Sequence, residues 1–168
     1  MNLIKIHDDL EIASRIQEIG AALTKRFTGE DLLFIGILKG ASIFTADLLR
    51  AISFPCHYDF IQEMKSLEAI NKISFIGGGW QNYNGIVFLL KDVIHSGIIE
   101  NYLVTQFKEN GAKDVHIISI IDRPQERKVD IEPIYSLFVE NEGIFAGYGM
   151  EYKQKYGNLS YIVRVEEK

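Results

Sequence analysis

The chain has 168 residues, of which 47% are hydrophobic and 24% charged, and its formal net charge is −5. This composition is that of a globular protein and excludes a disordered one, while the acidic balance argues against a general nucleic-acid binder, which usually shows a basic face. The lone Cys56 excludes an internal disulfide. Neither a signal-like start nor an apolar run of membrane-spanning length is present, so we expect a cytoplasmic protein without membrane association.

The first part of the chain predicts a helix followed by a buried strand. Asp8 or Asp9 is placed to cap a helix in which apolar residues recur at helical spacing until Thr28-Gly29. The unalternating apolar run Leu32–Ile37 then predicts a strand that is buried on both faces.

A second helix and a second strand are expected next. Residues 41–52 predict an amphipathic helix. Its inward face is expected to hold Ile43, Leu48 and Leu49. Residues 58–61 predict a short strand, and the irregular, glycine-containing stretch 62–85 predicts a loop or hairpin.

The clearest unit of the sequence is a strand, a helix and a second strand. Residues 86–90 predict a buried strand, residues 91–97 a polar turn, and residues 98–110 a helix that Gly111 ends. Residues 115–121 predict the next buried strand. Together with its neighbours this unit predicts an α/β fold, a twisted and mainly parallel sheet flanked by helices, with residues 1–168 in a single domain.

Two predicted turns lie where ligands collect in parallel sheets, at the carboxyl ends of strands and near helix N-termini. They are Lys39-Gly40-Ala41-Ser42 and the turn from Asp92 to Gly97. The first amide groups of the helix after Gly97 have no intrahelical partners, so an anion is favoured there. The alternative is that Ser96 only caps the helix and Gly97 only eases the turn.

Three ionisable side chains in these loops are candidates for chemistry. Asp92 and His95 lie three residues apart and can both face one ligand, the carboxylate binding hydroxyls or Mg²⁺ and the imidazole acting as an acid, a base or a charge partner. A structural histidine is the alternative for His95. Arg123 follows the next strand, and its planar fork can meet a carbonyl oxygen and a ring nitrogen together, unless it is only a surface arginine before a proline turn.

The segment from Ile144 to Tyr152 mixes aromatic and glycine residues with the carboxylate of Glu151. It can form a flat platform for an aromatic ligand, or it can simply pack in the core at a tight turn.

In their order and spacing these segments resemble the hypoxanthine-guanine phosphoribosyltransferase family over nearly the whole chain. The matching stretches are Gly36-Ile37-Leu38-Lys39-Gly40-Ala41, Asp59-Phe60-Ile61, Ile76-Gly77-Gly78, Asp92-Val93-Ile94-His95-Ser96-Gly97 and Gly147-Tyr148-Gly149-Met150-Glu151-Tyr152. The resemblance implies the type I phosphoribosyltransferase fold with a small hood and a mobile loop, and assembly as a homodimer or homotetramer. It also implies an enzyme of purine salvage that transfers ribose 5-phosphate from phosphoribosyl pyrophosphate to a 6-oxopurine, releasing pyrophosphate, with Mg²⁺.

The resemblance also implies roles for the residues that match the phosphate-binding motifs. Leu38-Lys39-Gly40 would be the pyrophosphate loop, often with a cis peptide before the lysine. The residues that would cradle the 5-phosphate are His95, Ser96, Gly97, Ile98 and Ile99. Asp92 would hold the ribose hydroxyls and, with Glu151, would lie beside the magnesium ion.

For the purine, the resemblance places Arg123 where the family has a lysine that reaches the exocyclic oxygen. Ile144 takes the place of the residue that stacks on the base, Phe145 lends its backbone, and Glu151 replaces an aspartate. His95 can substitute as a base near the purine N7, in place of an acid in the family.

The chain departs from the family pattern at several charged or polar positions. Lys91 and His95 each stand where the family has an acid, and Ile99 stands where it has a threonine. Leu67 replaces the tyrosine of the Lys65-Ser66-Leu67 mobile-loop motif, and Gly157 replaces an arginine. The transition state resembles an oxocarbenium ion, which carboxylates stabilise and a cation does not, so these changes predict weaker catalysis. The alternatives are a catalytically lapsed nucleotide-binding or regulatory protein on the same fold, or a structural subunit that binds nothing here.

Overall fold

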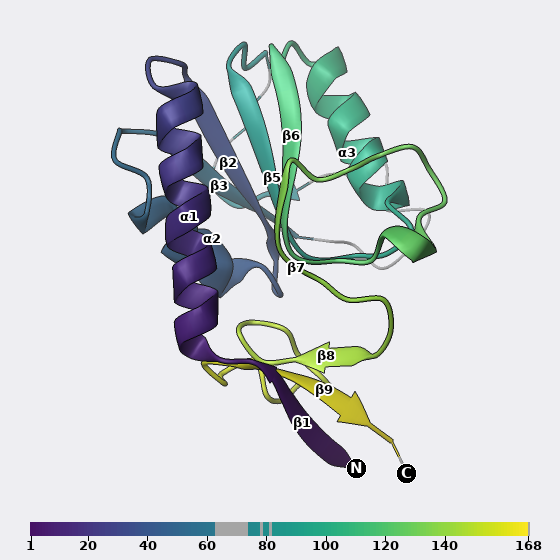
Figure 1. The fold of residues 1–168 in the computed structure, drawn as a ribbon. Helices are drawn as coiled ribbons and strands as arrows, with labels where there is room; N and C mark the ends of the chain where they lie inside the picture. The colour runs from purple at the N-terminus through teal and green to yellow at the C-terminus, as the bar shows by residue number, and fades with distance from the viewer. Residues whose placement is uncertain (63–73, 78, 81, 168) are drawn as a thin grey trace.

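The computed structural model describes residues 1–62, 74–77, 79–80 and 82–167. Its centre is a six-stranded sheet in the order β4-β3-β2-β5-β6-β7, in which only β4 runs antiparallel to its neighbour (Figure 1). The strands of this sheet are β2 (Leu32–Leu38), β3 (His57–Gln62), β4 (Ser74–Phe75), β5 (Ile86–Ile94), β6 (Asp114–Asp122) and β7 (Tyr135–Val139). The predicted twisted, mainly parallel sheet is therefore confirmed, with the short β3–β4 pair supplying the hairpin.

Helices cover both faces of this sheet. The helices are α1 (Asp9–Phe27), α2 (Ser42–Arg50) and α3 (Ile98–Glu109), and a short 3₁₀ helix, η1 (Pro124–Glu126), follows β6. Helices α1 and α2 lie on one face and α3 on the other (Figure 1). Because successive strand residues point to opposite faces, Phe34 packs with the first pair of helices while Leu33 packs with α3. None of the helices in the described ranges has both the length and the apolar character needed to cross a membrane.

The first helix begins and ends as its sequence predicts. The side chain of Asp8 accepts a hydrogen bond from the amide of Glu11 at 2.8 Å, so Asp8 is the N-cap. The helix ends at Thr28, and Gly29 follows with a φ of 89°. In α2 the predicted inward position of Ile43 is wrong, because this side chain is 38% exposed. The predicted Leu48 is buried, Leu49 is partly buried against the same core, and Phe44, four residues before Leu48, takes the inward place expected for Ile43.

The predicted polar turn at residues 91–97 is wrong in its first half. Strand β5 continues through Asp92 to Ile94, because Lys91, Val93 and Ile94 pair with β6. Lys91, for example, lies opposite Ser119 and is only 8% exposed. The turn proper is reduced to the three residues 95–97 before α3 begins.

A second, three-stranded antiparallel sheet lies at the end of the molecule towards which the carboxyl ends of the main strands point (Figure 1). It consists of β1 (Asn2–His7), β9 (Ile162–Glu166) and β8 (Ile144–Ala146) in that order, and it brings the two chain ends together. This sheet is the expected small hood. The expected mobile loop with Lys65-Ser66-Leu67 lies outside the described residues.

Candidate active site

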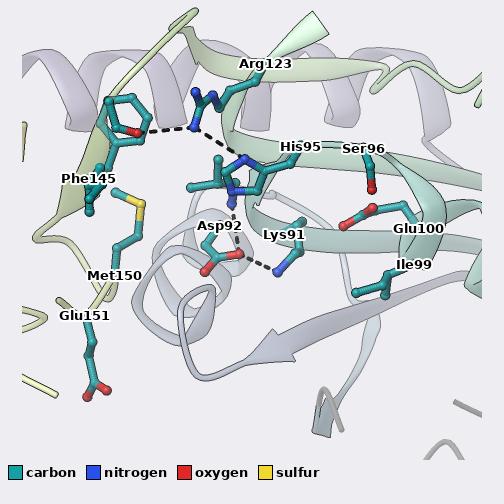
Figure 2. A pocket seen from close by; sticks show the side chains of 13 residues that line it. Lys91, Asp92, His95, Ser96, Ile99, Glu100, Arg123, Phe145, Met150 and Glu151 are labelled. Carbon is teal, nitrogen blue, oxygen red and sulfur yellow. Dashed lines mark hydrogen bonds and ion pairs between the residues drawn. The ribbon is translucent and has the colours of Figure 1, made fainter. Parts of the chain in front are cut away.

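A cavity of about 460 Å³ lies between the carboxyl ends of β5 and β6 and the hood (Figure 2). It is lined by Lys91, Asp92, Val93, His95, Ser96, Ile99, Glu100, Arg123, Gly143, Ile144, Phe145, Met150 and Glu151. Figure 2 shows Arg123 and Phe145 at one end of the cavity and Ser96 at the other, with Asp92 between them. One cavity therefore gathers most of the site residues that the sequence predicts, although they come from distant parts of the chain.

The predicted pyrophosphate loop borders an adjoining cavity of about 380 Å³, which shares Glu151 with the first and also includes Gly157. The peptide bond between Leu38 and Lys39 is cis, as the family resemblance implies. Lys39 Nζ donates a hydrogen bond to Glu151 Oε1 at 3.0 Å. The loop is thereby joined to the hood, and a cation lies where the two cavities meet.

Gly40 brings the backbone of this loop directly against the carboxylate of Asp92. A Cβ atom at position 40 would lie 1.9 Å from Asp92 Oδ2 and 2.5 Å from its Cγ. Only glycine fits at this distance. Behind it, Gly149 has a φ of +94°, and a Cβ there would lie 2.4 Å from the carbonyl oxygen of Gly40. The loop, the end of β5 and the hood are therefore packed closely around Asp92.

The carboxylate of Asp92 already has two partners. Oδ1 accepts a hydrogen bond from the amide of Val93 at 2.8 Å and lies 2.6 Å from Lys91 Nζ. The Lys91 side chain is 10% exposed and that of Asp92 24%, so solvent screens this ion pair only weakly. The negative charge at the centre of the cavity is thus compensated before any ligand binds.

The turn before α3 borders the cavity through His95, Ser96 and Ile99. Gly97 rather than Ser96 is the N-cap, with a φ of 76°, and Ser96 Oγ accepts one long hydrogen bond, of 3.4 Å, from the amide of Ile98. Ile98 is 49% exposed and does not line the cavity, whereas Ile99 does. Neither isoleucine plugs the turn, because Ser96 and Ile99 border open volume. An anion is favoured at such a helix start.

Arg123 is buried, so its reading as a surface arginine is wrong: the residue is only 8% exposed. Its Nη1 donates to the carbonyl oxygen of Gly143 and its Nη2 to that of Asn141, each at 3.2 Å. Its guanidinium lies 5.8 Å from the centroid of the Phe145 ring. The Nε atom is buried and has no hydrogen-bond partner within the described part of the chain. Arg123 is therefore a rigid donor fork at this end of the cavity.

His95 and Arg123 share a partner, Glu126, which no sequence motif marks. His95 Nδ1 lies 3.0 Å from Glu126 Oε2 and 3.4 Å from Arg123 Nη1. Arg123 Nη2 forms an ion pair with the other carboxylate oxygen of Glu126. The hydrogen bond to His95, with help from Arg123, holds the pKa of Glu126 below its ordinary value. The contact joins residues 31 positions apart, so no local pattern predicts it.

Two further lining residues, Glu100 and Met150, were also not selected from the sequence. Glu100 lies in the first turn of α3 and is only 3% exposed. The signal that could have found it is an acid at a helix start that faces a predicted anion site.

The donor set for a magnesium ion is incomplete in the protein alone. Asp92 and Glu151 offer hard carboxylate oxygens to the same cavity, but each is engaged by a lysine. Among the residues that the structure describes, no three His, Cys, Asp or Glu side chains converge to hold a metal ion. Mg²⁺ commonly binds through one or two carboxylates and completes its shell with water and phosphate oxygens. The site fits a magnesium ion of that kind.

Comparison with known proteins agrees with this arrangement. The protein-family model of the phosphoribosyl transferase domain matches residues 4–153 of this chain. The hypoxanthine-guanine phosphoribosyltransferase of Bacillus subtilis is 33% identical over 156 residues, which cover 90% of this chain and 87% of the relative. That of Streptococcus pneumoniae is 33% identical over 165 residues, which cover 96% of this chain and 91% of the relative.

Solved structures show the same fold. The crystal structure of a hypoxanthine-guanine phosphoribosyltransferase from Bacillus anthracis, with a HEPES molecule in its active site, matches with a TM-score of 0.87 at 27% identity, covering 96% of this chain and 98% of that one. A hypoxanthine phosphoribosyltransferase from Staphylococcus aureus matches with a TM-score of 0.87 at 28% identity, covering 96% and 92%. The expected type I phosphoribosyltransferase fold is confirmed, and the chain belongs to the phosphoribosyltransferase family, in its hypoxanthine-guanine branch.

Proposed function

We propose that the protein is a hypoxanthine-guanine phosphoribosyltransferase of purine salvage. In this reaction the bond from the ribose C1′ to pyrophosphate breaks, a bond from C1′ to the purine N9 forms, and a proton leaves the purine ring. The observation that carries the proposal is the single cavity in which Asp92, the amide-rich turn at Ser96 and the buried fork of Arg123 face one another. These groups suit, in that order, a sugar, a phosphate and a purine edge.

On the phosphate side, the main-chain amides of residues 95–99 would hold the 5-phosphate, and the amides of Leu38, Lys39 and Gly40 the pyrophosphate. Ile99 stands where the family has a threonine, and we expect this change to affect the binding of the 5-phosphate little, because backbone amides would supply most of the hydrogen bonds to it. Asp92 would accept hydrogen bonds from the ribose hydroxyls, since Lys91 and the amide of Val93 both contact its Oδ1 and not its Oδ2.

On the purine side, Arg123 would donate to the exocyclic oxygen of the base. Its Nη1 is the available donor, because its 3.4 Å contact to His95 is long and readily exchanged. Ile144, which is 46% exposed in the cavity wall, would cover one face of the base, and Phe145 would add backbone contacts. His95 would take the proton that leaves the purine N7.

A magnesium ion would be held by Asp92 and Glu151 together with phosphate and water oxygens. When bound it would neutralise charge on the departing pyrophosphate. Lys39, which now pairs with Glu151 at 3.0 Å, would turn to the pyrophosphate as that carboxylate engages the metal.

The second candidate function, a catalytically lapsed nucleotide-binding or regulatory protein, is favoured by one observation. Lys91 places an ammonium group 2.6 Å from Asp92, the carboxylate that would hold the ribose on which positive charge would develop. A cation there raises the barrier to transfer, yet it does not oppose an anionic nucleotide that is already formed.

The test is to incubate the pure protein with phosphoribosyl pyrophosphate, Mg²⁺ and hypoxanthine, guanine or xanthine, and to follow nucleotide formation. We expect slow turnover with at least one base. No turnover, together with a raised melting temperature in the presence of purine 5′-nucleotides, would establish the second function instead. If the protein neither turns over substrate nor binds a nucleotide, both functions are excluded. A homodimer or homotetramer is part of the proposal, and light scattering on the same sample checks it.

A further inference from the structure

We propose that Glu126 is the positioning residue of the site: it fixes the tautomer of His95 so that the ring presents the lone pair of Nε2 to the cavity. The inference rests on the proposed function, in which His95 takes a proton from the purine.

The carboxylate of Glu126 is held so that its two oxygens contact different residues. The 3₁₀ helix η1 places Glu126 three residues after Arg123, and the amide of Glu126 donates to the carbonyl oxygen of Arg123 at 3.0 Å. The ion pair with Arg123 Nη2 engages Oε1. The other oxygen, Oε2, faces His95 Nδ1 at 3.0 Å. Because Arg123 is buried, its ion pair with Oε1 fixes the carboxylate, and Oε2 is the oxygen that faces His95.

The two neighbours of His95 Nδ1 require opposite protonation states of this nitrogen. The carboxylate oxygen of Glu126 at 3.0 Å requires a hydrogen on Nδ1, whereas the guanidinium of Arg123 at 3.4 Å requires a lone pair there. Neutral imidazole cannot satisfy both. The bond to the carboxylate prevails, because it is the shorter one and its acceptor is ionised, while 3.4 Å is beyond the normal range for such a bond. Nδ1 therefore carries the hydrogen and Nε2 the lone pair.

The lone pair of Nε2 is available to a ligand. No residue in the described part of the chain forms a hydrogen bond with Nε2, and His95 lines the cavity with about half of its side chain exposed. The backbone of His95 is fixed separately, because its carbonyl oxygen accepts a hydrogen bond from Arg127 Nη1 at 2.9 Å. The ring is thus anchored on the Glu126 side and open on the other.

This arrangement balances the proton step. As the bond from C1′ to the purine N9 forms, the proton on N7 passes to Nε2, and the imidazolium that results releases it to water after the product leaves. Glu126 stabilises the imidazolium, while Arg123 opposes it and Lys91 and Asp92 on β5 largely offset each other. Without the carboxylate, Arg123 would favour the tautomer with the hydrogen on Nε2, and this nitrogen could then not take the proton from the purine.

The experiment compares Glu126→Gln with wild type in the full chain, with kcat, KM and the pH dependence of kcat/KM as readouts. We expect kcat to fall roughly 10- to 100-fold with little change in KM. The acid limb of the profile should move to lower pH, since the imidazolium loses its carboxylate. In a His95→Ala background the same substitution should cause no further loss. The control is Glu132→Gln, an exposed acid in the loop that follows, which should behave as wild type.

A readout that needs no activity separates failure of this inference from failure of the proposed function. Nitrogen-15 chemical shifts of the imidazole groups report the tautomer of each of the four histidines, and His95→Ala identifies the signal of interest. We expect hydrogen on Nδ1 in wild type and a shift towards hydrogen on Nε2 in Glu126→Gln. A wild-type Nε2–H tautomer overturns the inference even if the enzyme is active, as does a Glu126→Gln variant with unchanged kinetics or with a further loss beyond His95→Ala.

Discussion

Gly40→Ala tests the close packing around Asp92, because it inserts a methyl group where the carboxylate now lies. The new Cβ would be 1.9 Å from Asp92 Oδ2, whereas ordinary contact begins at 3.4 Å. Asp92 must therefore swing away, losing the amide hydrogen bond of Val93 at 2.8 Å and the Lys91 pair at 2.6 Å. A carboxylate moved in this way no longer meets the ribose hydroxyls. One charged hydrogen bond contributes about 1.5–3 kcal/mol, which corresponds to a loss of roughly 10- to 100-fold in affinity.

Isothermal titration with a purine 5′-monophosphate measures this loss, and the melting temperature of each variant shows whether the fold is retained. Gly79→Ala is the matched control, because a Cβ at position 79 meets nothing within 4 Å. The control should bind nucleotide as wild type does. A folded Gly40→Ala protein with unchanged affinity would refute the placement of Asp92 at the sugar.

Three further predictions follow from other contacts. Lys91→Gln removes the cation beside Asp92 and should raise kcat roughly tenfold or more; an unchanged or lower kcat in the steady-state assay would exclude Lys91 as the cause of slow turnover. Tyr148→Phe removes the 2.6 Å hydrogen bond from the phenol to Asp47 and should lower the free energy of unfolding by about 1.5–3 kcal/mol in urea titrations, against no change if the bond contributes nothing. Burial lowers the pKa of the His116 imidazole in the folded protein, so the unfolded chain binds a proton there more readily. The free energy of unfolding should therefore fall as the pH drops below about 6.5 towards the folded pKa. Urea titrations at pH 7.5 and 5.5 measure this fall, and it should be smaller in His116→Gln.

Elements that depend on local chemistry could be predicted from the sequence. Asp8 caps α1 through a contact only three residues away, and the apolar run Leu32–Ile37 has no other stable place than between two layers of helices. The rim of the site was also predictable, because the turns at Lys39 and Ser96 follow strands of a parallel sheet.

Features that depend on distant partners could not be predicted. Lys91 and Asp92 look like a polar turn, yet they remain in β5 because β6 offers backbone partners to Lys91 and Val93, on either side of Asp92. Arg123 looks like a surface residue, yet the carbonyl groups of the segment before β8 and the acid Glu126 bury it. Glu126 itself has no distinguishing neighbour in sequence, and only the folded chain brings it to His95.

The central claim is that one cavity holds the sugar phosphate at the start of α3 and the purine beside Arg123, and a crystal structure with inosine 5′-monophosphate tests it most directly. In that crystal structure we expect the phosphate on the main-chain amides of residues 95–99, the ribose hydroxyls at Asp92 and the base between Ile144 and Arg123. A nucleotide bound elsewhere on the protein, or an empty cavity at saturating nucleotide, would contradict it.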